Sequence, residues 1–391
     1  MRRPGSRFSR QRSIVAVLAI ALATALAACS SGSSSSAGSG SSPSSSGSTS
    51  SASQSGASAT VQAAVAAAEK EPTSIGASAT FGKFKPKSGG SLYLVSCDLA
   101  IVGCSSLAGG VKAAAAAIGY KYTVCNTGET QTQMDGCFTN AVNAKPSAAI
   151  IDGGTAQQAG AGYAALRKAG IPIIGIFTNN PPGTSSAEVG ATTCAVEAET
   201  VANAVIVGGN GHPHALFLTE SSIGCDVQRT AAFTAQYQKE CPGCSLKFVK
   251  FDYATMQQNL PSEVQAALVQ NPDTDWVVGV FDQPASVAVT EIQQAGLSAK
   301  VKVAGMDGVP ANLELIRKGQ IQVYDEAISQ AEDGWVAVDA AARIYSGLKV
   351  PFDIGVNTFL ISPNNIATIP ADNAWPGPPN YPQQFEQLWN G

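Results

Sequence analysis

The chain has little of what nucleic-acid-binding proteins and many enzymes depend on. Histidine occurs only twice in 391 residues, and charged side chains make up 13% of the chain, with 24 basic and 28 acidic residues. A net charge of −4 does not attract a phosphate backbone, so we expect no nucleic-acid partner. The 45% of hydrophobic residues indicates instead a compact protein with a large core.

The two histidines lie in His212-Pro213-His214, with no carboxylate or cysteine at ligand spacing beside them. We therefore predict a turn before a strand rather than a metal site. The glycine cluster at 208–211 precedes a strand, which is the wrong order for a phosphate-cradling loop. The sequence also has no Gly-x-Ser-x-Gly elbow and no histidine placed as a general base. We expect no metal, no cofactor and no enzymatic activity.

The apolar segment near the N-terminus is shorter than the roughly 20 residues that span a bilayer. It covers residues 14–28, follows five arginines and ends at Cys29. A basic stretch before a short apolar run predicts a signal peptide over residues 1–28. Leu26-Ala27-Ala28-Cys29 resembles the bacterial lipobox, whose cysteine receives a diacylglycerol; the alternative is an ordinary secretory signal with a chance cysteine. We predict lipidation of Cys29 and an anchor on the extracytoplasmic face of the bacterial cell membrane.

Residues 30–58 are almost entirely serine, glycine and alanine, so they offer no apolar periodicity around which a core could form. Such a segment is typical of a flexible tether. We assign residues 29–87 to the lipidated cysteine and the tether, with a short helix at 61–69. The folded domain is then expected to work close to the membrane surface.

Eight of the nine cysteines remain once Cys29 is set aside, an even number on the oxidising side of the membrane. Eight cysteines allow 105 pairings. The economical set joins neighbours in the sequence: Cys97 with Cys104, Cys125 with Cys137, Cys194 with Cys225, and Cys241 with Cys244. The last pair forms a Cys-x-x-Cys motif that is an alternative redox centre, but its central Pro-Gly favours a tight turn and a structural bridge.

Short runs rich in valine and isoleucine alternate with longer amphipathic or alanine-rich stretches from Ser91 onward, which indicates βα units in parallel sheets. A first series has strands at 92–96, 120–125, 148–152 and 171–177, with helices at 107–118, 131–143 and 156–169. A second has strands at 215–219, 246–251, 276–281 and 301–305, with helices at 227–240, 260–271, 285–295 and 311–318. A strand at 321–324, a helix at 331–344 and a proline-rich tail follow. Because single cores stop growing at this size, the two series predict an α/β fold of two Rossmann-like lobes.

Ligands of open parallel sheets bind beyond the carboxyl ends of the strands, so the candidate site lies just after each strand. The predicted ligand-binding residues at these places are Ser96, Asp98, Asp152, Phe177, Thr178, Asn179, Arg229, Asp282 and Asp307. Carboxylates, amides and a guanidinium suit a small polar solute, because they make directional hydrogen bonds. Structural alternatives stay open: Asp152 and Asp282 as helix caps, Asp307 as a turn residue, and Arg229 as a solvated helix charge.

Residues 90–350 resemble the ribose-binding-protein-like members of the type I periplasmic binding proteins. The resemblance rests on Arg229 within residues 228–233, on Val280-Phe281-Asp282, and on the Gly-x-Asp-Gly-x-Pro stretch at 305–310. It implies three chain crossings, near Thr193, Ala327 and Asp353. The N-terminal lobe is then residues 88–192 plus 328–353, and the C-terminal lobe with the tail is 193–327 plus 354–391.

The chain departs from the sugar-binding relatives at several places. Phe177 and Thr178 stand where those relatives carry an Asp-Arg pair, and Met306 replaces a phenylalanine. The aromatic pair of the first loop is missing from residues 101–104. Glu326 and Gln330 are the candidates for a glutamine near the last strand. These differences bear on which sugar or sugar-like solute binds.

The resemblance implies a monomeric solute-binding lipoprotein of an ABC importer, with a permease and ATPase complex as its membrane partner. The alternatives are an anchored envelope hydrolase that uses Asp152 and Asp307, and a sensory ligand-binding subunit. Substrate turnover separates the hydrolase from a receptor, which returns its ligand unchanged. We also expect Arg229→Ala to abolish stabilisation by ligand while leaving the stability of the unliganded protein nearly unchanged.

Overall fold

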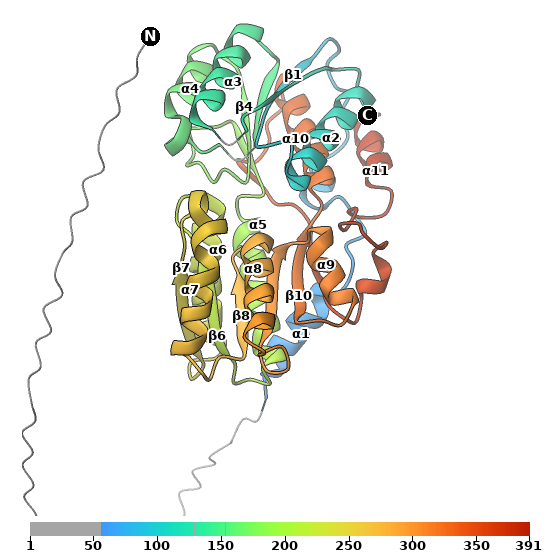
Figure 1. Cartoon of the computed structure of the whole chain (residues 1–391). Coiled ribbons are helices and arrows are strands. Elements are labelled where there is room, and N and C mark those ends of the chain that lie inside the picture. Colours follow the sequence, from blue (N-terminus) through green and yellow to red (C-terminus); the bar gives the residue numbers. More distant parts are fainter. Residues whose placement is uncertain (1–55, 129, 153) are drawn as a thin grey trace, which may run out of the picture. The chain divides into compact units, whose positions relative to one another are not determined.

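The computed structural model describes residues 56–128, 130–152 and 154–391, which are drawn in colour in Figure 1. The predicted signal peptide, Cys29 and the first part of the tether lie outside these residues. None of the helices within the described ranges combines the length and the apolar character that crossing a bilayer needs.

The first lobe is built on a sheet whose strands are all parallel, in the order β11-β5-β4-β3-β1-β2. The strands are β1 (Ser91–Ser96), β2 (Lys121–Asn126), β3 (Ala148–Asp152), β4 (Ile173–Ile176), β5 (Ala187–Val189) and β11 (Asp353–Ile354). The helices that flank this sheet include α2 (Val102–Ala117), α3 (Gln131–Ala144), α4 (Ala156–Lys168) and α10 (Gln330–Tyr345).

Both faces of this sheet are covered, which explains why its strands read as unbroken apolar runs. Successive side chains of a strand point to opposite faces. Leu92 and Leu94 accordingly pack in one core cluster with residues of α2 and α10, whereas Tyr93 and Val95 pack in another with Phe138 of α3 and residues of α4.

The second lobe has a sheet in the order β12-β10-β9-β8-β6-β7, parallel except for β12, which runs antiparallel to β10. Its strands are β6 (His214–Thr219), β7 (Ser245–Lys250), β8 (Trp276–Gly279), β9 (Lys302–Asp307), β10 (Gln322–Ile328) and β12 (Thr358–Ile361). Its helices are α5 (Thr193–Gly208), α6 (Gly224–Glu240), α7 (Met256–Gln270), α8 (Asp282–Gln294) and α9 (Pro310–Arg317). Short 3-10 turns lie at Gly76–Phe81, Tyr253–Thr255 and Ile366–Thr368.

The chain passes between the two sheets at three places: between β5 and α5, between β10 and α10, and between β11 and β12. These places agree with the crossings expected near Thr193, Ala327 and Asp353. The predicted fold class, two Rossmann-like lobes with parallel sheets flanked by helices, is confirmed.

Helix α5 is the largest element that the sequence pattern did not predict. Ten of its residues are buried, because α1, α6 and strands of the second sheet all pack on it. The buried set includes the polar Glu197, whereas the apolar Val196 is 48% exposed, so the amphipathic period that identifies surface helices is blurred.

The two ends of the described chain pack differently from the sequence-based assignment, which placed residues 59–87 in the tether and 354–391 with the second lobe. Helix α1 (Ala59–Ala68) begins at its cap Ser58 and buries Val61 in the core of the second lobe. Helix α11 (Tyr381–Trp389) packs instead on α10 of the first lobe, where Trp389 stacks on Trp335 with ring centroids 5.4 Å apart. The cause is the apolar face of α11, which covers an aromatic side chain of α10.

All four predicted disulfides are confirmed: Cys97–Cys104, Cys125–Cys137, Cys194–Cys225 and Cys241–Cys244. Their Cα atoms lie 5.4–5.7 Å apart, within the usual range for a bridge. The first bridge belongs to the first lobe, and the third fastens the start of α5 to the start of α6.

Candidate functional site

A cavity of about 240 Å³ lies where the carboxyl ends of the strands of the two sheets face one another. The first lobe supplies Asp152, Phe177 and the Cys97–Cys104 disulfide to its wall, and the second lobe supplies the charged residues Asp226, Arg229, Asp282 and Asp307. A larger hollow of about 570 Å³ lies at the ends of α7 and α8, but Lys300 is the one charged residue among the described residues that line it. The cavity between the lobes is therefore the candidate site.

Arg229 occupies the centre of the site's polar network. Phe233, one turn further along α6, is completely buried in the second lobe, so Arg229 lies on the inward face of the same helix. Its guanidinium donates to the carboxylate of Glu197 on α5 at 2.9 and 3.1 Å and to Asp307 at 2.7 Å. A fourth bond reaches the carbonyl of Val280 at 3.1 Å. Arg229 is thus a buried ion-pair centre, not a solvated helix charge.

Glu197 balances the charge of Arg229 from behind the cavity. The carboxyl of Glu197 is completely buried, and burial raises its pKa to about 7 although Arg229 opposes the shift. Removing either partner leaves the other in a place where water cannot solvate it. The pair therefore fixes the guanidinium before any solute arrives.

Asp307 is directed into the site by the end of β9. Its backbone has a φ of 106°, a conformation that residues with a side chain rarely adopt, and the following Gly308 has a φ of 70°. The N–H of Gly308 donates to the Asp325 carboxylate at 3.0 Å, which holds this turn in place. Strained backbone of this kind persists where the surroundings enforce it, and it is often found at functional sites.

Asp282 forms an acidic pair with Asp325 at the carboxyl end of the second sheet. The Asp282 carboxylate accepts a hydrogen bond from the N–H of Val309 at 2.7 Å, so it links the start of α8 to the segment after β9 and is not the cap of its own helix. Burial and the neighbouring carboxylate raise the pKa of Asp282, and burial raises that of Asp325 to about 7. The pair therefore binds a proton more tightly than an isolated carboxyl does.

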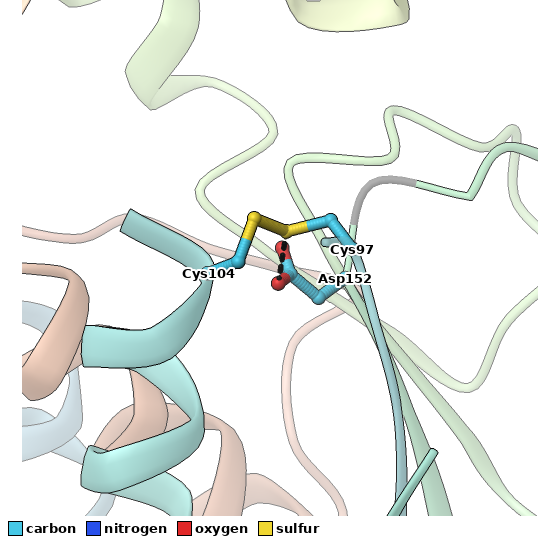
Figure 2. A group of neighbouring side chains, drawn as sticks. All are labelled: Cys97, Cys104 and Asp152. Carbon is cyan, nitrogen blue, oxygen red and sulfur yellow. Dashed lines mark hydrogen bonds between the residues drawn. A yellow bond between two sulfur atoms is a disulfide. The ribbon is translucent and has the colours of Figure 1, made fainter. Parts of the chain in front are cut away.

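Asp152 is the charged residue of the first lobe in the cavity wall. Its carboxylate points at the disulfide between Cys97 and Cys104, with 2.9 Å between Oδ2 and the sulfur of Cys97 (Figure 2). Asp152 does not cap α4, because Thr155 does so through its own side chain. Burial raises the pKa of the Asp152 carboxyl to about 7.

Of the nine predicted site residues, five line the cavity: Asp152, Phe177, Arg229, Asp282 and Asp307. The other four lie outside its described wall. Ser96 is completely buried, Thr178 donates to Glu188 at 2.6 Å, and Asp98 accepts from the N–H of Ala100 in its own loop. Asn179 donates to Gln228 of the second lobe at 3.1 Å, so it joins the lobes. A role in solute binding stays a prediction for each of the nine.

Several lining residues were not predicted from the sequence, among them Asp226, Tyr253 and Phe281. Asp226 was detectable, because it precedes Arg229 by three residues and therefore lies on the same face of α6. Tyr253 and Phe281 carry no such signal. Of the two candidates near the last strand, Gln330 lines the cavity, whereas Glu326 lies in β10 outside its described wall.

Among the described residues, two groups of side chains have a spacing suited to a metal ion: Cys97, Cys104 and Asp152, and Cys194, Glu197 and Cys225. In both groups the two sulfurs are joined in a disulfide, so neither offers the thiolates that a metal would need. These groups are better explained as bridges that shape the cavity.

Several solved structures share the fold at low sequence identity. A glucose-galactose binding protein from Geobacillus stearothermophilus is 20% identical, with a TM-score of 0.65 over 71% of this chain and 99% of that one. A 5-methylthioribose transporter solute binding protein from Thermotoga lettingae is 17% identical, with a TM-score of 0.65 over 78% and 99%. An ABC transporter solute binding protein from Mycobacterium smegmatis with bound glycerol is 19% identical, with a TM-score of 0.65 over 74% and 100%.

A search of curated proteins finds no match to the chain. The family model described as "Periplasmic binding protein domain" matches residues 98–349. That match covers more than half of the chain and contains every polar residue described above for the cavity wall. The chain therefore belongs to the periplasmic binding protein domain family, a family of solute-binding proteins and not of enzymes.

Proposed function

We propose that this chain is the solute-binding lipoprotein of an ABC importer. It captures a small polar solute, sugar or sugar-like, between its lobes and delivers it to a membrane permease driven by an ATPase. It acts as a monomer on the extracytoplasmic face of the membrane, where the lipid on Cys29 holds it. The lobe boundaries predicted from the sequence are part of this proposal, with α11 reassigned to the first lobe.

The observation that carries the proposal is the cavity at the carboxyl ends of both sheets, with Arg229, Asp282 and Asp307 fixed in its wall. Its volume lies below the roughly 300–1,000 Å³ typical of sites for drug-sized ligands, so it suits a small solute. Fixed carboxylates and a guanidinium make directional hydrogen bonds to hydroxyl groups. The solutes named for the similar structures, glycerol and 5-methylthioribose among them, are small hydroxylated molecules.

Three crossings between the lobes allow the cavity to open and close about a hinge. A solute that contacts both walls binds the closed form more tightly and shifts the equilibrium toward it. The closed form is then the one that the permease recognises. Closure around the solute therefore tells the permease that a solute is bound and ready for delivery.

A thermal-shift panel of sugars, polyols, amino acids and small amides on the full chain in detergent tests the capture step. A solute at 100 times its dissociation constant is expected to add about 2.7 kcal/mol to the stability of the protein. Asp307→Asn should weaken that stabilisation, whereas Asp135→Asn, at an exposed position of α3, serves as the matched control. Recovery of a chemically altered solute would contradict the proposal, because a receptor returns its ligand unchanged.

Lipid labelling of cells tests the anchor. Cys29→Ala should stop incorporation of labelled fatty acid and either release the protein or leave its precursor uncleaved. Ser30→Ala, one residue further on, should label as the parent does. Unchanged labelling of the Cys29→Ala protein would refute the anchor and leave the capture step untouched.

A further inference from the structure

The acidic groups in the wall of the cavity outnumber the basic ones. Among the described residues that line it, four are acidic, namely Asp152, Asp226, Asp282 and Asp307, and Arg229 is the one cation. The guanidinium of Arg229 is already shared by Asp307 at 2.7 Å, Asp226 at 3.6 Å and the buried Glu197 at 2.9 Å. One positive charge therefore serves three carboxylates before Asp152 and Asp282 are counted.

Asp152 has no cationic partner among the described residues. Its nearest neighbour is the Cys97–Cys104 disulfide, and a bridged sulfur carries no proton to donate (Figure 2). On its other side lies another acid: burial and the carboxylates of Glu332, Glu197 and Asp152 raise the pKa of Asp333. Asp152 is partly exposed to the cavity, so a solute can reach it.

An unpartnered carboxylate oxygen in the cavity wall is a second, independent observation that favours a positively charged ligand. Asp226 lines the wall with a residual exposure of 3%, and its Oδ2 has no hydrogen-bond partner. Behind the cavity, both carboxylate oxygens of the completely buried Asp333 also lack a partner. Each of these carboxyls ionises only at the cost of an unpaired buried charge, so the cavity has an excess of acidic groups that a cation would stabilise.

Neutral hydroxyl groups do not remove this excess, because they accept and donate hydrogen bonds without bringing charge. A protonated amine donates up to three hydrogen bonds and also carries a positive charge. The disulfide, Ile101 and Phe177 beside Asp152 offer an apolar surface for the carbon skeleton that bears the amine.

We propose that the solute carries a protonated amine and that Asp152 is its counter-ion, while its hydroxyl groups bind Arg229 and Asp307. The ligand class is therefore small aminated polyols and amino sugars, not neutral sugars. This inference rests on the proposed function and narrows its substrate.

Calorimetric titration of the full chain in detergent, at neutral pH, with pairs of probes that differ by an amine in place of a hydroxyl tests the inference. The pairs are D-glucosamine with D-glucose, D-galactosamine with D-galactose, D-glucamine with D-sorbitol, and 2-amino-1,3-propanediol with glycerol. We expect an aminated probe to bind at least tenfold more tightly than its partner, a difference of about 1.4 kcal/mol.

Asp152→Asn keeps the size of the side chain and removes its charge. It should weaken binding of the amine tenfold or more and change binding of the hydroxyl partner less than about threefold, with the unfolding temperature retained. Asp135→Asn, which neutralises an exposed carboxylate of the same lobe, should change neither.

Each other outcome overturns the inference. Neutral members that bind as tightly as the amines would disprove the ligand class and leave the proposed function intact. An amine preference that survives Asp152→Asn would disprove the assigned counter-ion. The absence of binding by every probe and by the wider panel of solutes would count against the inference and the proposed function together.

Discussion

The second lobe presents to the cavity a guanidinium already held by Glu197 and Asp307, whereas the first lobe presents Asp152 beside a disulfide and without a counter-charge. In the second lobe, the hydrogen bonds of Arg229 and the turn after β9 exist without a solute. Binding to that wall costs little reorganisation, because its side chains are already ordered.

The first lobe makes the opposite contribution. The Asp152 carboxylate obtains its counter-charge from the solute, so this wall rejects solutes that carry no positive group. The difference teaches that affinity and selectivity are divided between the lobes. Each of the following changes tests one side of that division.

Loss of Arg229 is expected to have the largest effect. Arg229→Met should destabilise the unliganded protein by about 3–5 kcal/mol, because it leaves Glu197 buried without its partner. This revises the sequence-based expectation that the unliganded stability stays nearly unchanged, since the sequence did not reveal Glu197. Urea unfolding measures the loss, and the double variant Arg229→Met/Glu197→Gln should recover part of it without recovering solute binding. A loss under about 1 kcal/mol in the single variant would mean that the pair does not hold the second lobe.

The disulfides of the two lobes should differ in what they stabilise. Cys194–Cys225 spans 31 residues and Cys97–Cys104 spans 7, so the loop-entropy model gives about 3.7 and about 2.4 kcal/mol. Replacing each pair by serines and unfolding in urea compares the two values. The first-lobe pair should in addition weaken solute binding, because it forms the wall beside Asp152. If both variants bind the solute equally well, the Cys97–Cys104 disulfide does not contribute to solute binding.

The pH dependence of stability should follow the buried carboxyls of both lobes. Burial raises the pKa of Asp152, Glu197 and Asp325 to about 7 and that of Glu332 to about 8, from about 4 in the unfolded chain. These groups bind protons more tightly when folded, so their stabilisation is full below about pH 4 and is lost as the pH rises through 7 to 8. The free energy of unfolding should fall by more than about 1 kcal/mol over that range, and Glu332→Gln should flatten the curve at its upper end. Stability that rises with pH would contradict these assignments.

The smallest effect is expected where the lobes touch. Asn179 of the first lobe donates to Gln228 of the second at 3.1 Å, and Gln228→Ala removes that bond. A hydrogen bond of this kind contributes about 0.5–1.5 kcal/mol, so solute affinity should drop threefold to tenfold with little change in unliganded stability. Titration calorimetry measures the affinity, and urea unfolding measures the unliganded stability. Tighter binding by the variant would show that the bond opposes closure.

Most of the βα framework could be predicted from the sequence, because each strand buried on both faces leaves a short run of valine and isoleucine. Strand β3 was predicted to the residue, and β1 began one residue earlier than expected. The missed helices have other causes. Helix α5 has a blurred period, because it buries Glu197 and exposes Val196. Helix α11 gains its stability from α10, which lies far from it in the sequence.

The candidate site divides in the same way. Residues that follow a strand directly, such as Asp152, Asp282 and Asp307, could be placed because the ends of parallel strands share an edge. The sequence did not show that Thr178, which also follows a strand, donates to the buried Glu188 and lies outside the cavity wall. Tyr253 reaches the wall from a loop whose course no local pattern describes.

The sequence by itself determined the two βα series, the cysteine pairs and the polar residues at the strand ends, because these depend on local periodicity and on short separations along the chain. Only the tertiary structure decided the charge balance of the cavity. Glu197 lies 32 residues from Arg229, and Asp152 lies 77 residues from it in the other lobe. Whether a carboxylate has a counter-charge depends on distances in space and on exclusion of water, and neither is written into the order of residues.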